Sequence, residues 1–133
     1  MNDLSNEDRV KSMYKNFGEG NMPAVIAAYD KDVIWLRSGA PDIPFSGTFT
    51  GIDGMSKMLT LIDQTIKLKH FIPKIFCSND DTVVVLGHDE AVIKATGKTY
   101  QTDWVQSFTF RNGKIIHAQV YMDTLAVMKA INP

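Results

Sequence analysis

Asp123 closes the segment "NGKIIHAQVYMD" (112–123), in which a turn and an apolar strand lead to a carboxylate. A carboxylate among apolar neighbours has a raised pKa and can act as a general acid or base near neutral pH. The same residue directly precedes "TLAVMKA", a segment with helical character, and aspartate is a common N-cap. Both interpretations of Asp123, pocket carboxylate and helix cap, are open from the sequence.

Asp89 is the second candidate carboxylate, in the segment "LGHDEAV" of an otherwise apolar strand. Strand alternation places His88 and Glu90 on one face and Asp89 on the other, with the valines and alanine that line the interior. Burying a carboxylate is costly unless it is bonded, so an inward Asp89 favours a functional role. The alternative is a bulge at Gly87 that turns the polar cluster outward.

Five further side chains are candidates for contact with a ligand. Arg37 shares one face of the strand "VIWLR" with Trp35, and it either enters a pocket as the partner of a carboxylate or lies in solvent at the strand end. Trp104 belongs to an alternating aromatic run and is predicted to be core or pocket wall. The hydroxyls of Tyr14 and Tyr121 either donate hydrogen bonds to a ligand oxygen or stay at the boundary of the core.

The remaining chemistry-bearing residues indicate neither a metal nor a cofactor. His70, His88 and His117 have no ligand spacing, and Cys77 has no accompanying Cys–His pattern. No glycine-rich phosphate loop follows a strand, so nucleotide binding is not supported. The reactions that two carboxylates could support here, namely isomerisation, aldol-type cyclisation and hydration, need no cofactor.

The bulk composition is that of a globular protein with one domain over residues 1–133. The chain is 44% hydrophobic and 22% charged, with 14 Lys+Arg against 15 Asp+Glu and a formal net charge of -1. No basic stripe supports a nucleic-acid partner. The start "MNDLSNEDRVK" lacks the apolar run of a signal peptide, and no apolar stretch is long enough to span a bilayer. We therefore expect a soluble, cytoplasmic protein without a membrane partner.

The first half of the chain is predicted to be mainly helical. Ser5 caps a first helix that ends at Gly18, and a second helix begins near Pro23 and carries Tyr29 on its apolar face. The strand "VIWLR" follows, then the loop "SGAPDIPFSGTFTG", which is rich in glycine and proline and could form an irregular hairpin. The segment "GMSKMLTLIDQTI" has the apolar spacing of a third helix.

The second half changes from a helical to an extended period. A strand bent or bulged at Pro73 is followed by "TVVVLGHDEAVIKA", "TYQTDWVQSFTFR" and "KIIHAQVYM", which short turns connect. The turn at Asn112-Gly113 is the strongest hairpin signal, because both residues tolerate positive φ. Strands joined by short turns are antiparallel. These patterns predict an α+β domain, with a cone-like curved antiparallel sheet wrapped around N-terminal helices and an internal pocket.

The order of elements, with "YKNFGEGNMPAVIAAYDKDVIW" and "GKTYQTDWVQSFTFRNGKIIHAQVYMD", resembles the nuclear transport factor two-like or ketosteroid-isomerase-like superfamily. Within it the chain looks like SnoaL-like polyketide cyclases and limonene-epoxide hydrolase. The resemblance implies a site in the open end of the cone and a homodimer formed through the sheet. It also implies that Asp123 and Asp89 correspond to the two catalytic carboxylates of epoxide hydrolases, while Gly87 stands where their linking arginine would be.

The sequence thus predicts a protein that binds a small apolar or cyclic organic molecule and carries out acid/base chemistry on it. The alternative is a non-catalytic ligand-binding or dimerisation module of the same fold. In the catalytic hypothesis the proton is moved by Asp123 or Asp89. The residues predicted to shape and polarise the site are Tyr14, Trp35, Arg37, Trp104 and Tyr121.

Overall fold

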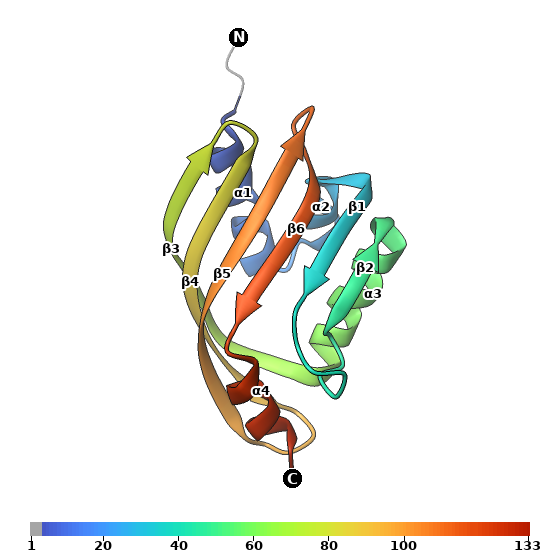
Figure 1. The fold of residues 1–133 in the computed structure, drawn as a ribbon, viewed down its shortest axis with the longest axis vertical. Coiled ribbons are helices and arrows are strands. Elements are labelled where there is room, and N and C mark those ends of the chain that lie inside the picture. Colours follow the sequence, from blue (N-terminus) through green and yellow to red (C-terminus); the bar gives the residue numbers. More distant parts are fainter. Residues whose placement is uncertain (1–3) are drawn as a thin grey trace.

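The computed structural model describes residues 4–133, which form four helices and six strands (Figure 1). The helices are α1 (Asn6–Gly18), α2 (Met22–Ala27), α3 (Gly51–Thr65) and α4 (Thr124–Ile131). The strands are β1 (Tyr29–Arg37), β2 (Gly47–Thr50), β3 (Ile66–Asn79), β4 (Thr82–Ile93), β5 (Thr99–Arg111) and β6 (Lys114–Met122). None of the helices among these residues is long and apolar enough to cross a bilayer.

The six strands form one sheet in the order β2-β1-β6-β5-β4-β3. The pairs from β3 to β6 are antiparallel hairpins, as the short turns predict. The predicted α+β class is confirmed, but the sheet is mixed, because β1 and β6 run parallel. These two strands are far apart in sequence and no tight turn joins them, so nothing forces them to be antiparallel.

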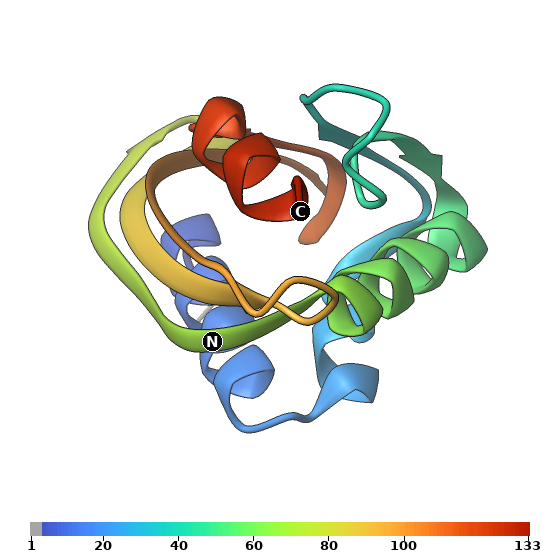
Figure 2. The same ribbon diagram turned by 90° about the horizontal axis from the view of Figure 1, so that it is seen from below.

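The sheet curls, and α1, α2 and α3 lie on its concave side while α4 lies at one end (Figures 1 and 2). The register of β3 against β4 shifts between Leu68 and His70 and again between Pro73 and Ile75. Such bulges bend a strand and increase its twist, which helps the long edge strand to curl. The predicted irregularity at Pro73 is therefore confirmed.

The core lies between the concave face of the sheet and the helices. α1 contributes Val10 and Met13, and α3 contributes Met55 and Met58, all 5% exposed or less. Each such side chain stabilises the fold by roughly 1.5–3 kcal/mol relative to an exposed position. The apolar stripes that the helical spacing predicts therefore face the sheet.

Local predictions in the first half of the chain hold except at Tyr29. Ser5 is the N-cap of α1, as predicted, and its Oγ accepts a hydrogen bond from the Asp8 N–H at 3.0 Å. However, α2 ends at Ala27, and Tyr29 begins β1 rather than extending the helix. Tyr29 pairs with Ile115 of β6, so tertiary strand pairing overrides the helical spacing of that segment. The segment after β1, predicted as a loop or an irregular hairpin, contains the short edge strand β2, which pairs antiparallel with β1 and confirms the hairpin alternative.

The hairpin between β5 and β6 supports a stability prediction. Asn112 has a φ of 52° and Gly113 a φ of 76°, as the Asn-Gly signal predicts. Gly113→Val forces a β-branched residue into this region, so we expect a loss of about one to several kcal/mol in the free energy of unfolding. Urea unfolding measures the loss, and Asn112→Gly serves as a control that should cost far less. An unchanged midpoint for Gly113→Val would contradict the turn assignment.

Candidate active site

A cavity of about 90 Å³ lies on the concave side of the sheet, beneath α1 and α3. Its three strongly polar lining residues, Arg37, Asp89 and Gln106, come from β1, β4 and β5. The rest of the lining is apolar or aromatic: Met13, Tyr14, Phe17, Val25, Tyr29, Trp35, Met55, Met58, Leu59, Ile62, Ile66, Leu68, Phe71, Tyr100, Trp104, Val120 and Met122.

Asp89 lies on the inner face of β4 and is 8% exposed. β4 pairs with β5 without a register shift, so the strand keeps its alternation and no bulge turns Asp89 outward. Burial raises the pKa of the Asp89 carboxyl to about 6, against the opposing effects of Arg37 and then His88. Its Oδ1 is buried and has no hydrogen-bond partner among residues 4–133. Asp89 is therefore a desolvated carboxylate that can exchange a proton near neutral pH.

Arg37 reaches the same cavity from the end of β1. Its guanidinium carbon lies 5.6 Å from the ring centroid of Trp35 and 5.2 Å from that of Phe45. Burial lowers the pKa of the guanidinium to about 10, so Arg37 remains charged at neutral pH. Its Nε is buried without a partner, and within the described chain Arg37 and Asp89 form no ion pair within 4.0 Å. The cavity thus contains two opposite charges that do not bond each other.

Trp104 occupies the space above Gly87, its cross-strand partner. A Cβ built on Gly87 would lie 2.3 Å from Cζ2 of the indole, so only glycine leaves room for this ring. The indole stacks on Phe71, with centroids 4.8 Å apart and planes 15° apart. Its Nε1 is buried and has no acceptor in the described part of the chain. Trp104 therefore forms a cavity wall that also carries a free hydrogen-bond donor.

Tyr14 and Trp35 complete the aromatic walls. The Tyr14 hydroxyl donates to Oε1 of Gln106 at 2.7 Å, and burial raises the Tyr14 pKa far above its usual value. Its single proton is thus committed to Gln106 rather than free for a ligand. Trp35 packs edge-on against Phe108, with centroids 6.2 Å apart.

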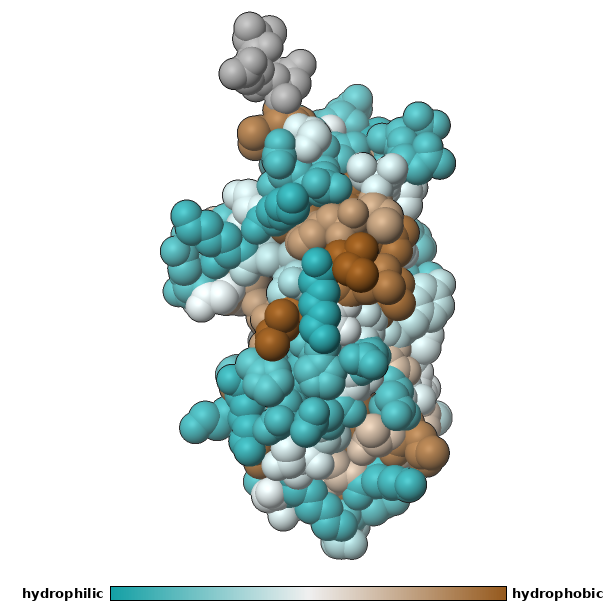
Figure 3. Space-filling model, turned by 90° about the vertical axis from the view of Figure 1, so that its left-hand side faces the viewer, coloured by the Kyte–Doolittle hydropathy of each residue, from teal (hydrophilic) through white to brown (hydrophobic). Residues whose placement is uncertain are grey.

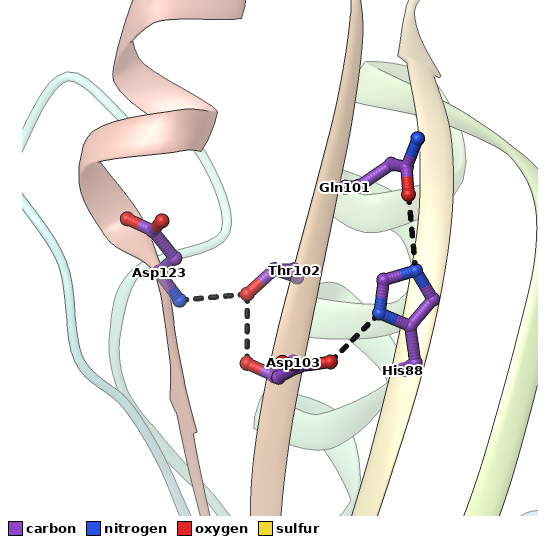
Figure 4. Close-up of polar contacts among 5 residues, drawn as sticks. All are labelled: His88, Gln101, Thr102, Asp103 and Asp123. Atoms are coloured by element: carbon purple, nitrogen blue, oxygen red, sulfur yellow. Dashed lines mark hydrogen bonds and ion pairs between the residues drawn. The ribbon is translucent and has the colours of Figure 1, made fainter.

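Asp123 lies outside the cavity lining and is exposed. It is the N-cap of α4, and its Oδ1 accepts a hydrogen bond from the Ala126 N–H at 3.1 Å. Its own N–H donates to Oγ1 of Thr102 at 2.8 Å, and Figure 4 shows the carboxylate turned away from Thr102. Tyr121 is 51% exposed and also lies outside the lining. The structure therefore brings Asp89, Arg37 and the three predicted interior aromatics together, without Asp123 or Tyr121.

Comparisons with known proteins identify the family and the fold. The family model described as the SnoaL-like domain matches residues 10–118. The chain belongs to the SnoaL-like family. No curated protein matches the sequence.

Solved structures similar to this SnoaL-like protein have the same fold. An NTF2-like protein from Burkholderia xenovorans is 28% identical, with a TM-score of 0.86 and coverage of 96% of this chain and 95% of that one. An NTF2-like protein from Burkholderia pseudomallei is 24% identical, with a TM-score of 0.89 and coverage of 98% and 100%. TerC, co-crystallised with polyporic acid, is 25% identical, with a TM-score of 0.83 and coverage of 96% and 98%.

Sequence reasoning does not identify several lining residues of this SnoaL-like protein, among them Gln106, Tyr100 and Tyr29. Tyr100 is 4% exposed, and burial, followed by the charge of Asp89, raises the pKa of its hydroxyl. It shares the inner face of β5 with Trp104, so the strand alternation that identified Trp104 also predicts Tyr100. Tyr29 was placed on a helix, and no local signal corrects that assignment. Within residues 4–133, no group of three or more His, Cys, Asp or Glu could hold a metal ion.

Asp123 supports a prediction that separates capping from catalysis in this SnoaL-like protein. Asp123→Ala removes the cap of α4, so we expect a loss of about 1 kcal/mol in unfolding free energy. Asp123→Asn keeps a capping oxygen and should be nearly neutral. Thermal unfolding of both variants measures the difference. A ligand affinity or rate that falls in Asp123→Asn, at an unchanged melting temperature, would show a role beyond the cap.

Proposed function

We propose that this protein is a single-domain, cytoplasmic SnoaL-like protein that binds a small apolar or cyclic organic molecule in the cavity and performs acid/base chemistry on it without a cofactor. Asp89 moves the proton. Arg37 and Trp104 polarise the ligand, and Tyr14 and Trp35 shape the walls. Asp123 has no part in this proposal, because its carboxylate is used at the cap of α4.

One observation carries the proposal. Three buried polar atoms have no partner among residues 4–133: Arg37 Nε, Asp89 Oδ1 and Trp104 Nε1. All three residues line the same cavity. Unsatisfied buried polar atoms are rare in folded proteins and each costs about 1–3 kcal/mol. Three such atoms around one apolar cavity support a ligand that accepts hydrogen bonds from Arg37 Nε and Trp104 Nε1 and donates one to Asp89 Oδ1.

The chemistry follows from which groups give and which accept protons. Above pH about 6 the Asp89 carboxylate is mainly ionised and can take a proton from a carbon next to a carbonyl group. The electron pair of that C–H bond becomes an enolate, and the Trp104 N–H can donate to the developing oxyanion. Return of the proton to a different carbon gives isomerisation. Attack of the enolate carbon on a second carbonyl of the same molecule breaks that C=O π bond, and the resulting alkoxide takes the proton back from Asp89, which gives aldol-type cyclisation.

The relatives support the ligand class. Polyporic acid, with which TerC was crystallised, is an organic molecule, and TerC covers almost the whole of this chain. The aromatic walls formed by Trp104, Phe71 and Trp35 suit a cyclic, largely apolar body. A protein that only binds such a molecule is the competing function, and the loss of Asp123 as a second pocket carboxylate favours it.

Deuterium exchange separates the two functions. The probe is 2-tetralone, a cyclic ketone with an acidic C–H, whose binding is first established by thermal shift. Proton NMR in D2O then measures exchange at the acidic carbon. The wild-type protein should accelerate exchange above buffer, and Asp89→Asn should lose about 10²–10⁴-fold of that rate. Binding without accelerated exchange in the wild type would favour the binding module.

We further propose a homodimer formed through the convex face of the sheet. A row of directly paired apolar residues crosses four strands on this face: Ile75, Leu86, Val105 and Tyr121. Ile75 is 54% exposed, Leu86 39% and Tyr121 51%. At the β3 side, hydrophobic surface interrupts the otherwise hydrophilic exterior (Figure 3). Contiguous exposed apolar surface of this kind supports an interface.

A charge in this row should break the dimer. Leu86 points away from the core, so Leu86→Lys is expected to leave the fold intact and to lower self-association at least about tenfold. Sedimentation equilibrium at micromolar concentration measures the mass. Thr48→Lys, on the exposed edge strand β2, is the control. A wild-type monomer under these conditions would contradict the proposal.

A further inference from the structure

Arg37 is a cation without an acceptor. Within residues 4–133, no backbone or side-chain group accepts a hydrogen bond from it, and no carboxylate lies within 4.0 Å. A guanidinium carries five N–H donors and no acceptor. The guanidinium packs over the rings of Trp35 and Phe45, which gives favourable cation–π contacts. These ring contacts accept no hydrogen bond from the N–H groups, which lie in the plane of the guanidinium.

Burial, rather than the lack of a protein partner alone, distinguishes Arg37 from the other cations of the described residues. Lys69 pairs with Glu90 at 3.2 Å, and the Lys98 amino group donates to the Asn132 carbonyl at 2.7 Å. These lysines lie at the surface, where water satisfies their remaining donors. Arg37 instead has its Nε fully buried beside an apolar cavity. A planar donor group in such a place fits a planar pair of acceptor oxygens.

The surface beside the cavity also favours negative charge. A groove of about 950 Å³ adjoins the cavity and shares with it Tyr14, Phe17, Leu59, Ile62, Ile66, Leu68 and Phe71. The charged residues of the groove are Lys67, Lys69 and Lys94 against Asp63, and because Lys69 is paired with Glu90, one positive charge is left in excess. The chain as a whole has a net charge of -1, so this positive balance is local. Clefts lined by one sign of charge raise the local concentration of the opposite sign.

We infer that the ligand of the cavity is a planar organic acid whose ionised oxygens bind the Arg37 guanidinium while its aromatic body lies along Trp104 and Phe71. The inference rests on the proposed function for its cavity and names the substrate class. A carboxylate and an acidic enol share this chemistry, because both delocalise one negative charge over two coplanar oxygens. Asp89, from β4, faces the remaining atoms of the ligand.

A matched pair of probes tests the charge requirement. 2-Naphthoate is a planar acid that is ionised at about pH 7, and 2-naphthamide has the same shape without the charge. Isothermal titration calorimetry should show that wild-type protein binds the acid about 10- to 100-fold more tightly than the amide. Arg37→Met keeps an apolar stem of similar length and should bind both probes equally. Equal affinity for the two probes in the wild type would overturn the inference.

Three further variants identify the source of any preference. Arg37→Lys keeps the charge without the planar fork, so it should retain part of the preference and remain informative if Arg37→Met does not fold. Lys67→Met tests the groove: a preference lost there but kept in Arg37→Met would overturn the assignment to Arg37. Asp89→Asn removes a negative charge that repels the acid in the same cavity, so it should keep or increase the preference for the acid. If the wild-type protein prefers the acid over the amide but does not accelerate deuterium exchange, only the proposed catalysis is rejected. If it accelerates exchange but shows no preference for the acid, only this inference is rejected.

The two acid classes are separated by a second pair. 2-Hydroxynaphthoquinone is an acidic enol, and its methyl ether is the neutral match. A larger Arg37-dependent preference in the quinone pair than in the naphthoate pair would identify an acidic enol as the ligand class, and the reverse would identify a carboxylate. Absence of an Arg37-dependent preference in both pairs would overturn the inference.

Discussion

At pH 7, Asp89→Asn is expected to unfold at a higher temperature than the wild-type protein while losing proton transfer. The wild-type carboxylate is 8% exposed and its Oδ1 has no partner in the described structure, so its ionised form is held at a cost. The shift of its pKa from 3.8 to about 6 means that the ionised carboxylate lowers the free energy of unfolding by about 3 kcal/mol at pH 7. The asparagine amide is also buried and has a desolvation cost of its own. We therefore expect a net gain of about 1–3 kcal/mol in the free energy of unfolding.

The sign of the pH dependence follows from the direction of the shift. The folded-state pKa of Asp89 is raised, so below pH about 4 the carboxyl is protonated in both states and imposes no cost of ionisation. Between about pH 4 and 6 the folded protein retains a proton that the unfolded chain has lost, and stability falls as the pH rises. Above the folded pKa the full cost is present. The stability of Asp89→Asn should therefore exceed that of wild type at pH 7 and approach it below pH 4.

Urea unfolding at several pH values measures this difference. Asp42→Asn removes the same charge from an exposed loop and serves as the control, since it should show no comparable gain at pH 7. An Asp89→Asn variant that is less stable than wild type at pH 7, or a difference between the two that does not change with pH, would contradict a desolvated Asp89. The exchange assay with 2-tetralone gives the second half of the result, the loss of about 10²–10⁴-fold in rate.

The sequence predicts the sheet side of this site well, because strand alternation is a strong local signal. The period of two in β4 and β5 correctly predicts that Asp89 and Trp104 face inward, and the turn at Asn112-Gly113 joins β5 to β6 as predicted. The register shift between Thr109 and Phe110, next to this turn, has no signal in the sequence. The candidate carboxylate Asp123 was ambiguous for a physical reason. A strand end that precedes a helix is both a rim position and a cap position, and only the hydrogen bond to Ala126 separates the two.

The features that sequence reasoning missed depend on contacts between distant segments. The parallel pairing of β1 with β6 has no turn to indicate it, and it draws Tyr29 out of the helical pattern into a strand. The same pairing carries Arg37 to the cavity, where nothing in the sequence "VIWLR" shows that it lacks an acceptor. The absence of a partner is a property of the whole packing and has no local signature.

Gly87→Ala is expected to distort the cavity although it adds only one methyl group. The new Cβ would lie 2.3 and 2.5 Å from two ring carbons of Trp104 and 2.7 Å from the carbonyl oxygen of Ile72. The indole is held against Phe71, and the Ile72 oxygen belongs to the backbone of β3, so neither neighbour can move freely. Overpacking of this kind typically costs about 1–3 kcal/mol, and the backbone contact places this substitution at the upper end or beyond.

The same substitution should change the site more than its stability alone suggests. When Trp104 moves, its Nε1 leaves the position from which it can donate to a ligand, so ligand affinity and proton exchange should fall while the sheet still forms. Urea unfolding, tryptophan emission and calorimetry with 2-naphthoate measure the three effects. Gly18→Ala is the control, because no atom lies within 4 Å of the Cβ that it adds and its φ is not positive. If Gly87→Ala melts like wild type with unchanged emission, the indole does not need the space that glycine leaves. If instead both stability and affinity fall, Gly87 is what allows the Trp104 indole to lie two residues along the sheet from Asp89, as the proposed site requires.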